Sequence, residues 1–379
     1  MSAIAPTSTS TSAPSPRCRP VPPLPPPPPR AKEPLRIGSV TVPTRFFLSP
    51  LAGYTALAYR LTVRELGGLG LATTDLVNAR SLIERRPKSF ELAATSPEDQ
   101  PASIQIYGAT AWEMIEATKI VADLGPSIID INMGCPVRKV VKAGGGSALM
   151  CDGEGARRLV EAVVEHSPVP VTVKMRLGWD QQHPTAPELA RLFESIGVAA
   201  VIVHGRTRAQ GFSGAVDRSG IARVVAAVER MPVVGNGDIR TVADAEAMFR
   251  ETGCAAISIG RGALSNPFLF RQLQHWAEHG TAGPEPSFED RLGVMERHFH
   301  RLVETRGEHL ACLQFRKVLK WYSYAIRPPK ELYLRLVNLP SRSRFDEVVA
   351  QIRAAGPSAP LPSQFEPRVP TPKGPIDRW

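Results

Sequence analysis

The sequence predicts an α/β protein built around a closed (β/α)8 barrel, or TIM barrel, followed by a small C-terminal helical domain. Between residues 35 and 275, short β-branched or apolar runs alternate with amphipathic helical stretches, and this alternation implies a parallel sheet. Eight such runs in about 240 residues match the size of a (β/α)8 barrel. An open doubly wound sheet is the alternative, but it usually carries a GxGxxG fingerprint after its first strand, where this chain reads PLAGYT.

The expected elements follow one another in order. Strands are expected at residues 45–50, 69–77, 102–108, 127–133, 170–176, 199–205, 232–238 and 255–262. Helices are expected between most of them, at residues 58–66, 111–124, 154–166, 187–196, 218–230 and 241–252. The interval after the second strand shows no equally clear helix.

Prolines mark the limits of the folded part. Residues 1–34 contain 12 of the 37 prolines and residues 356–379 contain seven. A run such as VPPLPPPPPR favours polyproline II and cannot build a packed core. We therefore expect disordered Pro-rich tails at 1–34 and 356–379, a barrel at 35–280 and a helical domain at 281–355. A proline-rich ligand or a transit peptide are the other interpretations of residues 1–34.

Composition narrows the class of protein and its compartment. No stretch of 18 or more residues lacks charged and polar groups, which argues against a membrane-spanning helix. Five scattered cysteines without a CxxC pair argue against a disulfide framework or a metal cluster and favour the reducing cytoplasm. The net charge of +10 favours an anionic partner or substrate. A monomer is the expected state.

Polar side chains follow the predicted strands where their carboxyl ends would meet. In a (β/α)8 barrel this end carries the active site, and polar residues at seven consecutive strand ends favour one shared site over isolated caps. The residues are Asp75, Asn78, Gln105, Asn132, Cys135, Lys174, Arg176, His204, Arg206, Asn236, Asp238 and Arg261.

The turns after the last two strands, GNGD (235–238) and GRGA (260–263), expose backbone N–H groups with little steric cover. The corresponding loops of barrels frequently bind a phosphate, and Arg261 can add a bidentate contact. Tight turns alone are the simpler interpretation, but a phosphate-bearing cofactor or substrate is the better one.

Cys135 lies just beyond the fourth strand, on a turn between a glycine and a proline. No histidine stands nearby in the sequence to form a thiolate, and a thiol near its usual pKa of about 8.5 is mostly protonated at neutral pH. A proton donor is therefore favoured over a nucleophile. Arg138, Lys139 and Lys142 follow and can either meet phosphates or form a solvated face, and Gly144–Gly146 would allow loop movement.

Two further polar residues end strands that are otherwise apolar. Lys174 follows VTV, and an inward lysine is costly unless it meets an anion or an electron-rich ligand. His204 follows AAVIV; a lone histidine there is often structural. Together with Gln105 these side chains would converge on one ligand from different strands.

At these positions the chain resembles a known family. The motifs SPLAGYT, QIYG, DINMGCPVRKV, GSALM, VKMRLGW, VHGRTRAQGFSG, VGNGDI and IGRGALSNPFLF, in this order over roughly residues 35–350, are similar to the signatures of the tRNA-dihydrouridine synthases, most closely the bacterial B-type branch. The resemblance implies an FMN-binding barrel that uses NADPH to reduce specific uridines in tRNA to 5,6-dihydrouridine. A hydride would pass from flavin N5 to uracil C6, and a cysteine would protonate C5.

The resemblance also implies roles for single residues. Cys135 would be the proton donor, and Asn132 and Arg176 would face the target uridine. The residues that would bind FMN are Pro50, Leu51 and Ala52 beside the ring, Gln105, Lys174 and His204 at its polar edge, and Asn236, Gly237, Asp238, Gly260 and Arg261 at the phosphate end. The first motif departs from its common form, because Ala56 and Ala58 replace an Asp and a Pro, and Val141 replaces a frequent Asn.

The C-terminal region has the charge of an RNA-binding surface. Residues 291–350 contain 12 Arg and Lys against six Asp and Glu. In FRKVLKWYSYAIR (315–327) aromatic and basic residues alternate, which fits RNA backbone and base contacts. We expect Arg316, Lys317 and Lys320 to face tRNA, and Phe315, Leu319 and Tyr322 to pack inward.

Two other functions compete with this one. An FMN barrel acting on a free pyrimidine would need no basic helical platform. A flavin-free relic that only binds tRNA would have no reason to keep Cys135, Lys174 and both phosphate loops.

Overall fold

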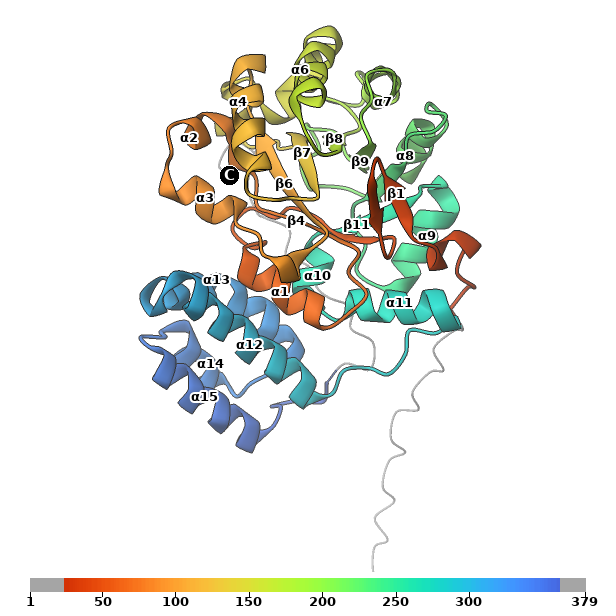
Figure 1. Ribbon diagram of the computed structural model, residues 1–379. Coiled ribbons are helices and arrows are strands. Elements are labelled where there is room, and N and C mark those ends of the chain that lie inside the picture. The colour runs from red at the N-terminus through yellow and green to blue at the C-terminus, as the bar shows by residue number, and fades with distance from the viewer. Residues whose placement is uncertain (1–23, 362–379) are drawn as a thin grey trace, which may run out of the picture.

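The computed structural model describes residues 24–361 and shows a ring of parallel strands surrounded by helices, with a helical region against one flank (Figure 1). The eight barrel strands are β3 (Phe46–Leu48), β4 (Leu71–Thr73), β6 (Ala102–Tyr107), β7 (Ile128–Met133), β8 (Val171–Arg176), β9 (Ala200–His204), β10 (Val233–Asn236) and β11 (Ala256–Ile259). Pairings of β3 with β11 and of β4 with β6 close the ring. A short β5 (Val77–Asn78) continues along the end of β6. The predicted (β/α)8 barrel is thereby confirmed.

Helices cover the outside of the ring. They are α1 (Leu57–Glu65), α4 (Ala111–Ala122), α6 (Gly153–His166), α7 (Ala186–Ser195), α8 (Arg218–Val225), α9 (Val242–Thr252) and α11 (Leu269–His279), with a short α10 (Arg261–Ser265) after β11. The helices α1, α4, α6, α7, α8 and α9 lie where the sequence predicted helices, whereas α10 and α11 were not predicted. Two short helices, α2 (Ala79–Ile83) and α3 (Pro87–Ala93), fill the interval that showed no clear helix. Helices this short cannot display two turns of apolar periodicity.

The amino end of the barrel is closed by an antiparallel hairpin that the sequence analysis did not predict. Its strands are β1 (Leu35–Ile37) and β2 (Val40–Val42). Leu35, Ile37 and Val42 are buried in one cluster with apolar residues at the amino ends of the barrel strands, among them Phe47 and Leu71. The burial of this apolar surface stabilises the hairpin on the barrel.

The two expected tails differ from the prediction at their inner ends. Residues 24–34 were expected to be disordered, but they pack against α11: the Trp276 indole N–H donates to the Pro25 carbonyl at 3.0 Å, and Ala31 is buried. At the other end, the Ser358 N–H donates to the Arg327 carbonyl at 2.8 Å. These hydrogen bonds and the burial of Ala31 order both segments in spite of their high proline content. The rest of both predicted tails, 1–23 and 362–379, lies outside the described residues.

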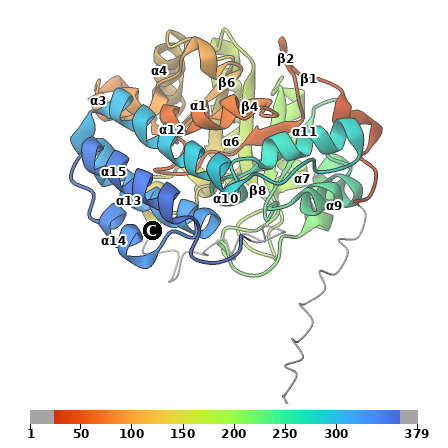
Figure 2. The same ribbon diagram turned by 90° about the horizontal axis from the view of Figure 1, so that it is seen from below.

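The helical region consists of α12 (Phe288–Arg306), α13 (Glu308–Ile326), α14 (Lys330–Val337) and α15 (Arg342–Ala355) (Figure 2). Its core is an aromatic cluster in which the Phe299 ring stacks on Phe345 at 4.0 Å and meets Phe315 edge-on at 5.1 Å. Phe315, Leu319 and Tyr322 are buried as predicted.

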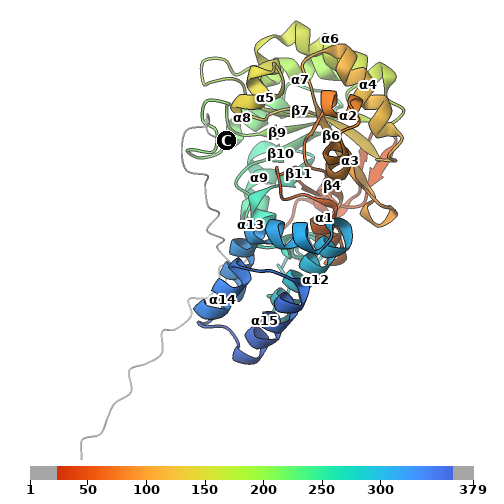
Figure 3. The same cartoon turned by 90° about the vertical axis from the view of Figure 1, so that its left-hand side faces the viewer.

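Ion pairs fix this region against the barrel. Arg301 on α12 reaches Glu65 on α1 at 2.7 Å, and Arg306 reaches Glu91 on α3 at 2.7 Å. As a result α13 runs beside the carboxyl end of the barrel (Figure 3). Within residues 24–361, no helix is long and apolar enough to cross a membrane.

Replacing Phe315 with Ala should destabilise the protein by about 3–5 kcal/mol, because it empties the centre of the aromatic cluster. Leu313→Ala is the matched control on the same helix: its side chain is 43% exposed, so the change should stay within about 0.5 kcal/mol. Denaturant unfolding of both variants measures the difference. Equal losses at the two positions would contradict the packing described for α13.

Candidate active site

A cavity of about 760 Å³ opens at the carboxyl end of the barrel, and its lining comes from the ends of all eight barrel strands. Every residue that the sequence analysis assigned to the cofactor lines it, as do Asn132, Cys135, Arg176 and Lys320. The other assigned basic residues do not. Arg138, Lys139, Lys142, Arg316 and Lys317 lie outside the lining, with exposed side chains.

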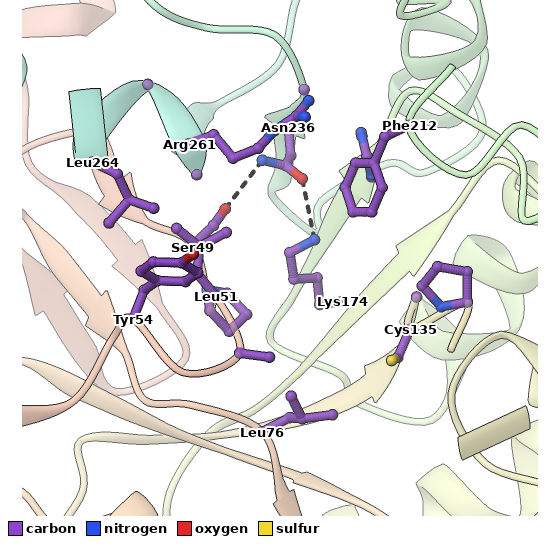
Figure 4. A pocket seen from close by; sticks show the side chains of 18 of the residues that line it. Ser49, Leu51, Tyr54, Leu76, Cys135, Lys174, Phe212, Asn236, Arg261 and Leu264 are labelled. Atoms are coloured by element: carbon purple, nitrogen blue, oxygen red, sulfur yellow. Dashed lines mark hydrogen bonds between the residues drawn. The ribbon is translucent and has the colours of Figure 1, made fainter. Parts of the chain in front are cut away.

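Asn236 connects the two sides of the cavity. Its carbonyl oxygen accepts a hydrogen bond from the Lys174 ammonium at 3.1 Å, and its amide nitrogen donates to Ser49 Oγ at 3.0 Å and to the Ser258 carbonyl at 2.6 Å (Figure 4). Burial, and then the neighbouring Arg176, lower the pKa of Lys174 to about 8. A pKa of about 8 leaves most of the Lys174 ammonium protonated at neutral pH, so a cation faces the middle of the cavity.

His204 is surrounded by cations. Burial, followed by the charges of Arg176, Lys174 and other arginines, holds the pKa of His204 well below its usual value. The ring is therefore neutral at physiological pH and offers a donor and an acceptor rather than a charge. His204 lines the cavity, and its charge state follows from the fold rather than from the sequence.

One end of the cavity has the chemistry of an anion site. The Asp238 carboxylate pairs with Arg206 at 2.5 Å, with Arg261 at 3.5 Å and with Arg240 at 3.8 Å, which leaves an excess of positive charge. The buried Nη1 atom of Arg261 has no hydrogen-bond partner among residues 24–361. An unmet donor on a guanidinium suits an incoming phosphate oxygen. The residues present therefore fit a phosphate group.

The backbone at this end also requires glycine. Gly237 has φ +123°, and a Cβ atom there would lie 2.7 Å from Val216 Cγ2 and 2.9 Å from the His204 ring. Only a residue without a side chain can occupy this turn. A steric limit alone therefore accounts for the glycine at position 237 of the GNGD motif.

Phe212 and Arg240 line the same end and were missed by sequence reasoning. The Phe212 ring lies 4.9 Å from the Arg261 guanidinium and 5.4 Å from that of Arg176, within cation–π range. Phe212 lies in the loop after β9, within the quoted segment GRTRAQGFSG. A lone aromatic residue in a loop gives no periodic signal, so only the fold could place it.

Cys135 faces the opposite part of the cavity from Arg261 (Figure 4). Its turn is held on both sides: the Cys135 N–H donates to Asn132 Oδ1 at 2.9 Å, and its carbonyl accepts from the Ser147 N–H at 3.1 Å. Gly146, at φ +58°, approaches so closely that a Cβ atom would lie 2.7 Å from the Cys135 carbonyl oxygen. The glycines that suggested a moving loop thus allow close packing behind the cysteine.

The thiol of Cys135 is only partly accessible. Burial raises its pKa, although Arg176 and Lys174 act in the opposite direction. The thiol form therefore prevails at neutral pH, in agreement with the proton-donor interpretation.

Some of the strand-end residues hold nearby loops and helices in place through hydrogen bonds to the backbone. Asn78 caps α2 by accepting from the Ser81 N–H at 3.0 Å, and Asp75 accepts from the Gly53 N–H at 2.5 Å, which holds the loop after β3. Arg176 lines the cavity, but its guanidinium donates to three backbone carbonyls, those of Gly134, Thr207 and Gly211.

The helical region also reaches the cavity. Lys320 and Trp321 on α13 belong to its lining, and the Trp321 ring meets Tyr54 edge-on at 6.3 Å. Sequence reasoning found Lys320 from its charge but missed Trp321 and Tyr54. The mouth of the barrel is therefore bordered by both parts of the chain.

Comparison with known proteins agrees with this arrangement. Residues 47–353 match the family model described as dihydrouridine synthase. The chain is 36% identical over 306 residues to a probable tRNA-dihydrouridine synthase of Rickettsia bellii, covering 80% of this chain and 93% of the relative. It is 37% identical over 289 residues to tRNA-dihydrouridine synthase B of Xanthomonas axonopodis pv. citri, covering 76% of this chain and 86% of the relative.

Solved structures with the same fold are more distant. Histamine dehydrogenase from Rhizobium superposes with a TM-score of 0.51 at 14% identity, over 72% of this chain and 51% of that one. Morphinone reductase superposes with a TM-score of 0.50 at 12% identity, over 69% of this chain and 92% of that one. At this identity the likeness concerns the fold alone.

The raised pKa of Cys135 predicts slow alkylation at neutral pH, because only the thiolate reacts. The alkylation rate, followed by mass spectrometry of the peptide that contains Cys135, should reach its midpoint at a higher pH in the folded protein than in the same protein unfolded by denaturant. A folded midpoint at or below the unfolded one would show a thiolate-stabilising site instead.

Proposed function

The chain belongs to the dihydrouridine synthase family, and from that premise we propose that it reduces specific uridines in tRNA to 5,6-dihydrouridine, with FMN as its cofactor and NADPH as reductant. The observation that carries the proposal is the arrangement of one cavity. A protonated thiol lies at one part of it, an arginine-rich end that could hold a phosphate at the other, and the Lys174 ammonium between them. A reductase that adds a hydride and a proton to a C=C bond needs these groups together.

The lining fits FMN in size and in chemistry. Gly237, Asp238, Gly260 and Arg261 would hold the phosphate, and Arg240, which sequence reasoning missed, would add a second cation there. Pro50, Leu51 and Ala52 would form the wall beside the ring. Bound FMN would supply the hydride for uracil C6.

Lys174, Gln105 and His204 would meet the polar edge of the flavin. Asn236 was expected at the phosphate end, but its contact with Lys174 would place it nearer this edge. A lysine ammonium at that edge favours negative charge on the ring, and the contact between Lys174 and Asn236 keeps it pointed into the cavity. Neutral His204 would act as a hydrogen-bonding group without adding to the repulsion among the surrounding cations.

Cys135 would give the proton to uracil C5. The S–H bond breaks as the C5–H bond forms, and the negative charge left on the uracil by hydride addition is neutralised. The charge then lies on sulfur, where the nearby Arg176 and Lys174 lower its energy. A proton from water restores the thiol. Asn132 and Arg176 would border the uridine from the side of Cys135.

The RNA would reach the cavity across basic surfaces. Arg316, Lys317 and Lys320 lie on exposed positions of α13, and Arg138, Lys139 and Lys142 lie on α5 (Arg138–Lys142), directly after Cys135. Because Lys320 belongs to the cavity lining while Arg316 and Lys317 do not, the α13 surface would lead phosphates toward the mouth. We accordingly propose residues 281–355 as the tRNA-binding domain of a cytoplasmic monomer.

FMN should be bound without a covalent bond, because the lining residues would hold it by hydrogen bonds, ion pairs and ring packing. Denatured protein should release a ligand with the mass of FMN. Arg261→Ala should lower the FMN content, whereas Arg271→Ala, an arginine on α11 outside the cavity, should leave it unchanged. Release of FAD would contradict the assignment.

Replacing Cys135 with Ala should reduce the rate of tRNA reduction by roughly 10²–10⁴-fold, the usual contribution of a positioned acid. FMN content and NADPH oxidation with oxygen as acceptor should persist, because neither needs this proton. Cys151→Ala is the matched control, since Cys151 is exposed and outside the cavity. Single-turnover reduction of unmodified tRNA measures the step, with free uridine as a parallel substrate. If the wild-type protein reduced free uridine but not tRNA, a free-pyrimidine reductase would be favoured instead.

A further inference from the structure

A continuous chain of hydrogen bonds joins a buried carboxylate to the backbone of Cys135. Asp130 Oδ2 accepts from Gln105 Nε2 at 2.6 Å. Gln105 Oε1 accepts from Asn132 Nδ2 at 2.7 Å, and Asn132 Oδ1 accepts from the Cys135 N–H at 2.9 Å. The chain crosses from β7 to β6 and back, and it ends at the turn that carries the thiol.

The direction of every bond in this chain is determined by its two ends. An ionised carboxylate can only accept hydrogen bonds, so Gln105 must turn its NH2 group toward Asp130. Its oxygen then faces Asn132, which must present its own NH2 group. At the far end the backbone N–H groups of Cys135 and Gly134 can only donate, and both point to Asn132 Oδ1. The two ends therefore impose the same orientation on both amides.

The register of the sheet makes this contact possible. Gln105 is the direct partner of Asp130 between β6 and β7, and Thr172 is the partner of Asp130 between β7 and β8. Thr172 Oγ1 donates to the second carboxylate oxygen at 2.6 Å. Both oxygens of Asp130 are thus occupied by side chains of adjacent strands.

Asp130 is unfavourable for stability on its own. It is 2% exposed, and burial raises its pKa to about 6. Because this pKa is higher in the folded than in the unfolded chain, stability is greatest when the group is protonated and falls as the pH rises through about 6. The contribution of Asp130 is therefore to be sought in the side chains that it orients, Gln105 and Thr172, rather than in its burial.

We propose that Asp130 is a positioning residue for the reaction at Cys135: it fixes the orientation of the Gln105 and Asn132 amides and, through them, the place of the cysteine turn in the cavity. Asp130 does not line the cavity, so it acts through its neighbours. The inference rests on the proposed function. Without the carboxylate, only the backbone N–H groups of Cys135 and Gly134 still orient the chain. Gln105 can then turn its amide over and present its NH2 group to Asn132, which weakens the hold of Asn132 on the Cys135 turn.

The test compares three variants. Asp130→Ala removes the acceptor and should lower the single-turnover rate of tRNA reduction on the order of 10²-fold, the effect of a misplacement of about 1 Å, with little change in KM for tRNA. Asp130→Asn should restore most of the rate, because its carbonyl can still accept from Gln105 while its NH2 group donates to Thr172. Thr172→Val is the matched control: it contacts the same carboxylate but lies outside the chain to Cys135, so its rate should stay near wild type.

Two further measurements separate the possible outcomes. NADPH oxidation with oxygen as acceptor should persist in all three variants. If Asp130→Ala does not fold, Asp130→Val fills the same strand position and carries the same expectation. A rate for Ala or Val near wild type, or a rate for Asn as low as that for Ala, would overturn the positioning role. If wild-type protein forms no dihydrouridine, the proposed function itself has failed.

Discussion

Closure of the parallel ring is the constraint on which the rest of this structure depends. Pairing of β3 with β11 and of β4 with β6 brings the carboxyl ends of eight strands to one opening. Residues as distant in sequence as Ser49 and Asn236 are then within hydrogen-bond distance. The two side chains bond to one another, and Asn236 also donates to the Ser258 carbonyl on the neighbouring strand β11. Without closure these residues would be separate loop caps.

The charge of the opening follows from this geometry. Lys174, Arg176, Arg206, Arg240 and Arg261 converge there, and the buried cations lower each other's pKa or find carboxylates and aromatic rings. His204 stays neutral as a consequence. The site is thus organised for a ligand that brings negative charge. Such a ligand would reduce the repulsion among these cations, which Asp238 alone compensates only in part.

Strands, most helices and the site residues at strand ends could be predicted, because buried parallel strands are continuous apolar runs and their polar ends stand out. Elements set by long-range contacts could not. Residues 226–230 looked helical, but α8 ends at Val225, and the Glu194 carboxylate accepts the N–H groups of residues 229–231 instead. The sequence predicted Asp130 only as part of a strand. The segment DINMGCP does not show whether its aspartate is buried in the barrel or caps a turn.

The position of the hairpin β1–β2 affects from which side molecules can reach the cavity. The buried apolar side chains of the hairpin pack against the barrel strands and cover the amino end of the ring. The opening bordered by α13, with Lys320 and Trp321 in its rim, is the route into this cavity. Under the proposed function, the reductant and the RNA would both enter through this opening, so the two could not occupy it at the same time.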